Sequence, residues 1–287
     1  ILFNTMVSKI QNLKKGLYIV STPIGNLLDI TLRALEILKN SDIILCEDTR
    51  NSKKLLSHYD IKKKLISYHK FNEKKITHEI IPIIEKSRII SLISDAGTPT
   101  ISDPGTFLIN TCLLRNIEII PIPGPSSVTS AISISGFSEK FIFQGFLPEK
   151  NKEFFKELEN LKNQNCSIVI FIPPKKFLKN IENFKKYFSD REIVICREMT
   201  KIYEQYLRIK VKDLNNIELN TKGELTVILS QKINPIKVFN SLTESDKKEI
   251  DKMVLNKSIK DILNFYKNKN ISKKIIYEYY LKRKKNI

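Results

Sequence analysis

Short apolar runs alternate with helix-like segments from Gly16 to about Ser135, and this alternation limits the possible folds more than any other feature. The runs expected to form strands are LYIVS (17–21), DIILC (42–46), LISYH (65–69), RIISLIS (88–94) and IEIIPI (117–122). A segment with helical spacing follows each run, for example DITLRALEILKN (29–40), where Asp29 or Thr31 can cap the helix. Continuous apolar strands that each lead into a helix are typical of a parallel sheet covered on both faces.

The alternation of strands and helices is interrupted at FIFQGFLPEK (141–150). From there a second α/β unit is expected to extend to about Lys232. The elements expected there are helices at 151–163 and 175–188 and strands at 166–172, 192–198, 203–210 and 223–231. The last two strands look able to pair antiparallel. A third segment is helical in pattern, with helices expected at 244–255, 257–267 and 271–284. Spacing places Ile275, Tyr279 and Leu281 on the inner face of the last helix.

The expected fold class is therefore α/β, with two α/β domains and a small C-terminal helical segment. The expected boundaries are a flexible arm at 1–15, an N-terminal α/β domain at 16–135, a C-terminal α/β domain at 136–233 and a basic helical tail at 240–287. A short linker is expected near Asn234 and Pro235, and Met6 is an expected translation start.

The charge is strongly positive, with 49 Lys and Arg against 31 Asp and Glu, a net +18. Such an excess favours a polyanionic partner, nucleic acid before membrane. Residues 246–287 hold 13 basic and 5 acidic residues, so part of the excess is local. A helix-turn-helix-like module that grips RNA is expected there; the alternative is that these charges only solvate helix faces. No apolar run approaches the roughly 18 residues of a membrane span, and the cysteines lack CxxC spacing, so a cytoplasmic protein with reduced thiols is expected.

Four unusual turns follow the expected strands of the first domain: TPIGN, EDTR, SDAGTPTISDPG and PIPGPSS. Each sits at the carboxyl end of its strand, where doubly wound sheets bind ligands. Glycine lets a ligand approach the backbone closely, and proline fixes a turn without offering a donor. Four such turns at one edge of one sheet predict a binding site there.

The loop at 91–105, SLISDAGTPTISDPG, contains two aspartates and no basic residue. The phosphate-binding GxxxxGK[ST] motif and the dinucleotide GxGxxG motif are both absent from the sequence. Asp95 and Asp103 would repel phosphate, whereas they suit ribose hydroxyls, an α-amino group or a sulfonium. The loop therefore predicts a small cationic nucleoside as ligand. The three histidines form no metal-binding pattern, so no metal site is expected.

The order of TPIGNLLDIT, EDTR, SDAGTPTISDPG, PIPGPSS and GFLPEK resembles the ribosomal RNA small subunit methyltransferase I family, over about residues 16–230. These are 16S rRNA cytidine-2′-O-methyltransferases of the tetrapyrrole-methylase fold. The resemblance implies S-adenosyl-L-methionine as the cofactor, held in a cleft between two α/β domains. It also implies a homodimer that acts on a cytidine in the decoding region of the small ribosomal subunit.

The resemblance also assigns residues to the cofactor. They are Asp95, Gly97, Thr98 and Ile101 on one side, Ser126 and Ser127 on the other, and Pro23 and Gly25 beside the transferable methyl group. Asp48 and Arg50 of EDTR become candidates for handling the ribose or its phosphate. The segments REMTKIYE and KGE match the second-domain pattern, which gives Glu198, Lys201, Glu204, Lys222 and Glu224.

The expected chemistry is an in-line displacement in which a ribose 2′-oxygen attacks a methyl group, so alignment is the protein's main contribution. The candidate bases are Asp48, Glu198 and Lys201, which the sequence does not rank; the alternative for each is a structural salt bridge. One departure from the family pattern is FIPPKKF, where relatives carry Phe-Tyr-Glu-Ser-x-His-Arg. It puts Pro173, Lys176 and Phe177 at the Glu, His and Arg positions.

Two other functions stay open at this point. One is a methyltransferase of small tetrapyrroles on the same fold, which the basic tail and the EDTR and DPG loops disfavour. The other is a basic RNA-binding protein without enzymatic activity, which would leave the four turns without a purpose.

Overall fold

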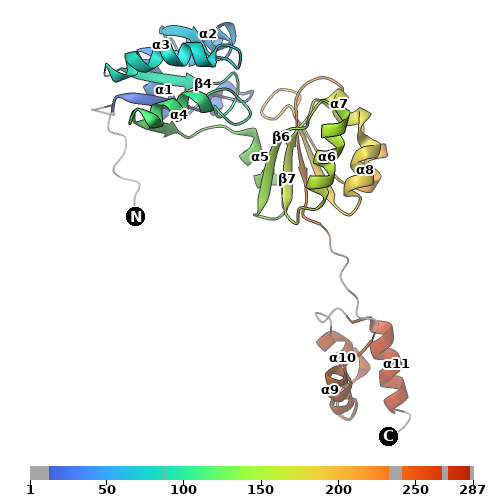
Figure 1. Ribbon diagram of the computed structural model, residues 1–287. Helices are drawn as coiled ribbons and strands as arrows, with labels where there is room; N and C mark the ends of the chain where they lie inside the picture. Colours follow the sequence, from blue (N-terminus) through green and yellow to red (C-terminus); the bar gives the residue numbers. More distant parts are fainter. Residues whose placement is uncertain (1–12, 87, 233–240, 267–270, 285–287) are drawn as a thin grey trace. The chain divides into compact units, whose positions relative to one another are not determined.

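The structure is a computed structural model that describes residues 13–86, 88–232, 241–266 and 271–284. The chain divides into two compact units, 1–232 and 233–287. Unit 1 contains two five-stranded sheets, and helices make up unit 2 (Figure 1). Most of the expected N-terminal arm and the expected linker near Asn234 and Pro235 lie outside the described residues.

The first sheet is parallel throughout, as the alternation of strands and helices predicted. Its strands are β1 (Gly16–Val20), β2 (Ile43–Cys46), β3 (Lys64–Ser67), β4 (Ile89–Ile93) and β5 (Ile119–Ile122), in the order β3-β2-β4-β1-β5. In the centre, β1 pairs with β4 and β5, so that Leu17 lies beside both Ile90 and Ile119. The carboxyl ends of parallel strands lie at one edge, which brings the four turns together.

Helices cover both faces of this sheet. They are η1 (Leu27–Asp29), α1 (Leu32–Asn40), α2 (Thr49–His58), α3 (Glu73–Glu85) and α4 (Thr106–Leu114). Side chains alternate along a strand, and β1 accordingly sends Leu17 to the core under α3 and α4 and Tyr18 to the core under α1 and α2. Of the two caps proposed for α1, Thr31 makes the contact, since its hydroxyl accepts from the N–H of Ala34.

The second sheet is mixed. Its strands are β6 (Phe141–Phe146), β7 (Ser167–Phe171), β8 (Glu192–Arg197), β9 (Gln205–Lys210) and β10 (Leu225–Leu229), in the order β6-β7-β10-β8-β9. β9 and β10 are each antiparallel to β8, which lies between them, rather than partners of each other. The burial pattern explains the order: β10 is buried along its whole length, whereas side chains of β9 alternate between partly buried and exposed, as on an edge strand.

Helices also cover both faces of the second sheet. One face carries α6 (Asn151–Lys162), α7 (Pro174–Lys179) and α8 (Ile181–Phe188), and the other carries α5 (Ser127–Ser135) (Figure 1). The single helix expected at 175–188 is divided at Asn180, whose side chain donates to the carbonyl of Lys176 and competes with the helical backbone. The remaining element of this unit is the 3₁₀ helix η2 (Val211–Asn216).

Unit 2 has its own core and its own helix caps. Its helices are α9 (Glu244–Val254), α10 (Ile259–Phe265) and α11 (Lys273–Lys284), and capping boxes begin α9 and α10. On α11 the buried residues are Ile276 and Tyr280, with Ile275 and Tyr279 packed beside them. The expectation for Leu281 was wrong, since it is 41 % exposed. It follows Tyr280 by about 100° of helical rotation, which turns it away from the core.

Candidate functional site

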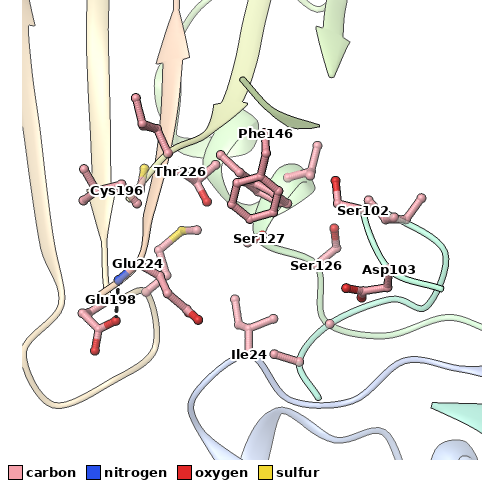
Figure 2. A pocket seen from close by; sticks show the side chains of 18 of the residues that line it. Ile24, Ser102, Asp103, Ser126, Ser127, Phe146, Cys196, Glu198, Glu224 and Thr226 are labelled. Atoms are coloured by element: carbon pink, nitrogen blue, oxygen red, sulfur yellow. Dashed lines mark hydrogen bonds between the residues drawn. The ribbon is translucent and has the colours of Figure 1, made fainter. Parts of the chain in front are cut away.

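A cavity of about 300 Å³ lies within unit 1, between the carboxyl-end turns of the first sheet and the second sheet. The turns contribute Ile24, Asp95 to Thr98, Ile101 to Asp103, and Ser126 to Val128. The other wall comes from Phe146, Phe171 to Pro173, Cys196, Glu198, Met199, and Gly223 to Thr226. Figure 2 shows Asp103 projecting inward from the loop after β4, on the side of the cavity opposite Glu224 and Thr226. Cavities of this size hold small molecules.

Hydrogen bonds tie the turns after β1, β4 and β5 into one assembly. The backbones of Thr22 and Gly97 bond to each other in both directions, at 2.9 and 3.0 Å. The Thr98 hydroxyl lies 2.9 Å from that of Ser21 and 3.2 Å from the carbonyl oxygen of Pro125. Gly97 has φ +81°, a conformation that other residues adopt only with strain. The three turns therefore form a fixed cradle rather than independent loops.

Backbone strain is concentrated around this cavity. Thr100 and Ser102, in the loop after β4, have φ of 71° and 70°. Glu198 and Thr200, in the loop after β8, have φ of 50° and 65°. Such angles are uncommon outside glycine and persist where the surrounding structure enforces them, often at functional sites. The four strained residues lie in the loops after β4 and β8, and both loops contribute residues to the cavity wall.

Asp95 is held by the loop that contains EDTR. One of its carboxylate oxygens accepts from the N–H of Asp48 at 3.2 Å, and the other accepts from the side-chain amide of Asn51 at 3.0 Å. These contacts fix the Asp95 carboxylate at the start of α2, where the helix dipole favours negative charge. Asp95 is thus a positioned anion on the rim of the cavity.

Asp48 and Arg50 interact with each other at the start of α2. The Asp48 side chain caps α2 by accepting from the N–H of Arg50, and it forms an ion pair of 2.7 Å with the guanidinium. Hydrogen bonds from Arg50 lower the pKa of Asp48 to about 2. A carboxylate with so low a pKa is a weak base, and neither residue is among the described residues that line the cavity.

Asp103 has the opposite environment. It is half-buried in the cavity wall, and burial raises its pKa to about 6, with the negative charges of Glu47 and Asp95 adding to the effect. The pKa of Glu47 is also raised, by burial and by Asp95. A carboxyl group in a cavity with a pKa near 6 can accept a proton at neutral pH. Asp103 was missing from the predicted catalytic residues; the sequence signal for it was a second Asp in a loop that otherwise lacks charge.

Glu198, Lys201 and Glu224 form an ion-pair network on the opposite side. The Lys201 ammonium lies 3.0 Å from Glu198 and 2.9 Å from Glu224, and Glu198 also accepts from the N–H of Glu224 (Figure 2). Burial raises the pKa of Glu198, but hydrogen bonds from Lys201 and from the Glu224 amide lower it overall. Burial lowers the pKa of Lys201, but bonds to Glu224 and Glu198 raise it overall. Both groups stay charged, which suits support of the loop better than proton transfer.

The loops of the two sheets also touch directly. The N–H of Asn26 donates to the Thr200 hydroxyl at 3.0 Å. A Cβ placed on Gly25 would lie 2.5 Å from a side-chain carbon of Lys201, so only glycine fits there. Pro23 and Gly25 flank Ile24, which supplies the lining of this turn. Gly25 therefore lets the turn after β1 pack against the loop after β8.

The predicted cofactor residues in the other turns all line the cavity: Asp95, Gly97, Thr98, Ile101, Ser126 and Ser127. Sequence reasoning missed the apolar wall from the second sheet, which includes Phe146, Phe171 and Met199. Those residues come from three different strand ends. Phe146 lies within GFLPEK and Met199 within REMTKIYE, but their apolar character alone does not distinguish them from core residues.

The three residues of FIPPKKF that depart from the family pattern have different surroundings in the structure. Pro173 lines the cavity, and Phe177 is buried in the core beneath α8. The Lys176 ammonium donates to the carbonyls of Leu147 and Pro148, at 3.1 and 3.2 Å. Lys176 thereby fastens the part of GFLPEK that directly follows the lining residue Phe146.

Two classes of site receive no support in the described part of the chain. It contains no cluster of three or more His, Cys, Asp or Glu side chains that could hold a metal ion. Likewise, none of its helices has the length and apolar character that a membrane span requires. All four cysteines are free thiols.

Residues 16–215 match the family described as Tetrapyrrole (Corrin/Porphyrin) Methylases. A protein of Thermotoga maritima named ribosomal RNA small subunit methyltransferase I is 45 % identical over 219 residues, which cover 75 % of this chain and 98 % of that protein. A protein of Rickettsia prowazekii with the same name is 40 % identical over 272 residues, covering 93 % of this chain and 90 % of that protein.

Solved structures with the same fold are more distant in sequence. A diphthine synthase superimposes with a TM-score of 0.58 at 13 % identity, covering 75 % of this chain and 89 % of that one. A uroporphyrin-III C-methyltransferase from Thermus thermophilus, complexed with S-adenosyl homocysteine, gives 0.53 at 14 % identity, covering 75 % of this chain and 97 % of that one. These likenesses establish the fold.

Proposed function

This chain belongs to the ribosomal RNA small subunit methyltransferase I family of tetrapyrrole methylases, and from that membership we propose that it methylates a ribose 2′-hydroxyl of a cytidine in the decoding region of 16S rRNA. The methyl donor is S-adenosyl-L-methionine. The observation that carries the proposal is the cavity at the carboxyl ends of β1, β4 and β5, where Asp95 and Asp103 lie across from a wall that includes Phe146, Phe171 and Met199.

The cavity suits a cationic nucleoside. Burial raises the pKa of Asp103 and of Glu47, and repulsion from neighbouring carboxylates, Asp95 among them, raises both values further. A bound cation relieves this repulsion. Asp95, Gly97, Thr98 and Ile101 would hold the cofactor on one side and Ser126 and Ser127 on the other, with the methyl group near Ile24 and its neighbours Pro23 and Gly25.

Bound S-adenosylmethionine supplies an activated methyl group. The chain's own contribution is to orient the ribose hydroxyl and to accept its proton. We assign proton acceptance to a carboxylate oxygen of Asp103, because Asp48 has a low pKa and Glu198 is engaged by Lys201. Glu198 and Lys201 are assigned to support of the loop after β8, and Arg50 to the RNA side of the site.

The test is transfer of labelled methyl groups from S-adenosylmethionine to naked 16S rRNA and to isolated small subunits that lack the modification. We expect one 2′-O-methylcytidine per subunit, located by nuclease mapping. Label on a tetrapyrrole acceptor instead would favour the small-molecule alternative. Binding of RNA without any transfer, under conditions where the cofactor binds, would favour a non-enzymatic RNA-binding protein.

We further propose that unit 2 contributes to RNA affinity and not to the chemistry. The Thermotoga relative aligns over 98 % of its own length with 75 % of this chain. Little of that protein therefore remains that could form an equivalent of unit 2. Exposed cations on α11 include Lys273, Lys274 and Lys282; Lys285 lies outside the described residues, and Arg283 is paired with Asp251.

Removal of residues 240–287 is expected to leave cofactor binding unchanged and to weaken binding to small subunits. Each lost phosphate contact should flatten the slope of log K against log salt by roughly 0.7–0.9. Filter binding of full-length and truncated protein over a range of salt measures this slope. An identical slope in both would show that unit 2 is a structural element and that the RNA is held by unit 1 alone.

A homodimer in the cytoplasm is also part of the proposal. The structural support for the dimer is a group of apolar side chains that are 76–93 % exposed: Leu28 in η1, Leu32 at the start of α1, and Ile202 and Tyr203 in the loop after β8. Such patches commonly mark protein interfaces. Light scattering should give twice the mass of one chain, and a monomer at micromolar concentration would contradict the dimer.

A further inference from the structure

A second depression, separate from the cavity, runs along α2 and the start of β3 in unit 1. It has a volume of about 900 Å³, three times that of the cavity. Its lining includes five cationic side chains, Arg50, Lys53, Lys62, Lys63 and Lys64, and one acidic side chain, Asp42. We refer to it as the α2 groove.

The positive charge of the α2 groove is largely uncompensated. Asp42 forms an ion pair of 3.0 Å with Arg88, which lies outside the groove lining. Arg50 is paired with Asp48, although its side chain is 86 % exposed. The four lysines are exposed, and no carboxylate in the described ranges forms an ion pair with any of them. Like charges gathered in a concave surface repel one another and attract anions.

The α2 groove begins beside the cavity. Arg50, at the first turn of α2, lines the groove, while the N–H of Asp48 and the side chain of Asn51 hold the carboxylate of Asp95, which lines the cavity. From there α2 extends for ten residues, or about 15 Å. A chain whose reacting nucleotide enters the cavity would thus meet a row of cations as it leaves.

We propose that the α2 groove binds the phosphate backbone of the rRNA strand adjacent to the methylated nucleotide. The inference rests on the proposed function for the identity of the RNA, but the groove's charge and position are independent of the chemistry. Lysines act on phosphates as point charges with no base preference. The groove therefore adds affinity and register, and the cavity selects the reacting nucleotide.

The test compares two quadruple variants of the full-length protein that remove the same charge. The groove variant carries Lys53→Gln, Lys62→Gln, Lys63→Gln and Lys64→Gln. The control variant carries Lys152→Gln, Lys156→Gln, Lys175→Gln and Lys179→Gln. These lysines are exposed on α6 and α7, which cover the face of the second sheet opposite to α5. These control lysines likewise form no ion pair with a carboxylate within the described residues.

The readouts are direct binding of a 16S rRNA fragment over a range of salt and, separately, the Kd for S-adenosylmethionine. In the groove variant we expect RNA binding at least tenfold weaker at 0.1 M salt, with a slope shallower by roughly 0.7 per lost contact, about 3 if all four lysines engage phosphates. The control should stay within about twofold of wild type, and cofactor affinity should be unchanged in both.

Equal RNA affinity in the groove and control variants would overturn the proposal. So would a loss of affinity with an unchanged salt slope, because it would show that no phosphate contacts were removed. RNA binding is measured without methyl transfer, so the two proposals can fail separately. Failure of the enzyme to methylate rRNA would contradict the proposed function, but it would not change the comparison of RNA affinity between the two variants.

Discussion

Replacing Asp103 with Asn is expected to reduce methyl transfer by about 10²–10⁴-fold, the usual contribution of a positioned general base, without destabilising the protein. Asn keeps the size of the side chain and can make similar hydrogen bonds, but it cannot accept the proton of the ribose hydroxyl. The substitution also removes the negative charge of Asp103, which is repelled by the charges of Glu47 and Asp95. Single-turnover methyl transfer and thermal unfolding, measured on the same preparation, test both halves of the expectation.

The pH dependence provides a sharper test of the same residue. In the free enzyme the pKa of Asp103 is raised to about 6, so kcat/KM of the wild type should rise with pH through about 6, as Asp103 loses its proton. Because this pKa lies above its ordinary value, the folded state binds the proton more tightly than the unfolded state does. The contribution of Asp103 to stability therefore falls as pH rises from about 4 to 6.

The Asn variant should lose both pH effects. A variant that retains near wild-type turnover would exclude Asp103 as the base. If turnover is low but kcat/KM still rises with pH through about 6, that rise belongs to the ionisation of another group. Glu47 is the next residue to test, because its pKa is also raised.

Replacing Asp95 with Asn should weaken cofactor binding by roughly 10–100-fold, since hydrogen bonds to a charged group contribute about 1.5–3 kcal/mol. The amide oxygen can still accept from the N–H of Asp48, and a flip of the Asn51 amide lets its oxygen accept from the new NH2 group, so the loop should keep its conformation while the charge is lost. Asp60→Asn is a matched control: Asp60 is exposed, and its φ of 55° is one that Asn tolerates well.

Calorimetry with S-adenosylmethionine and with S-adenosylhomocysteine distinguishes what Asp95 recognises. A greater loss for S-adenosylmethionine places the carboxylate near the sulfonium, because the thioether product lacks that charge. Equal losses place it near the α-amino group or the ribose. Wild-type affinity for both ligands would remove Asp95 from the cofactor site.

Much of the site could be predicted because parallel strands deliver their following turns to one edge. The apolar strands and the turns at 22–26, 95–105 and 121–127 carried enough information to place Asp95, Gly97 and Ser126 together. Proton affinity was not predictable in this way. The pKa of Asp103 depends on burial and on Glu47, which follows a different strand, and only the packed structure brings them close.

The sequence left two roles open for Asp48, a catalytic base or a member of a structural salt bridge. A carboxylate two residues before an arginine can also cap its own helix, and the structure shows Asp48 capping α2 and paired with Arg50. The order of β9 and β10 was hidden for a related reason: either strand can pair antiparallel, and the choice depends on which is buried on both faces.

The close contact at Gly25 has a consequence for how such a protein can change over time. Because the turn after β1 meets Lys201 with no space for a side chain, a larger residue at position 25 requires a compensating change in the loop after β8. Insertions in either loop meet the same constraint. The two α/β halves of unit 1 are therefore bound to diverge in concert, and pairs of positions across this contact are where correlated substitutions among homologues should concentrate.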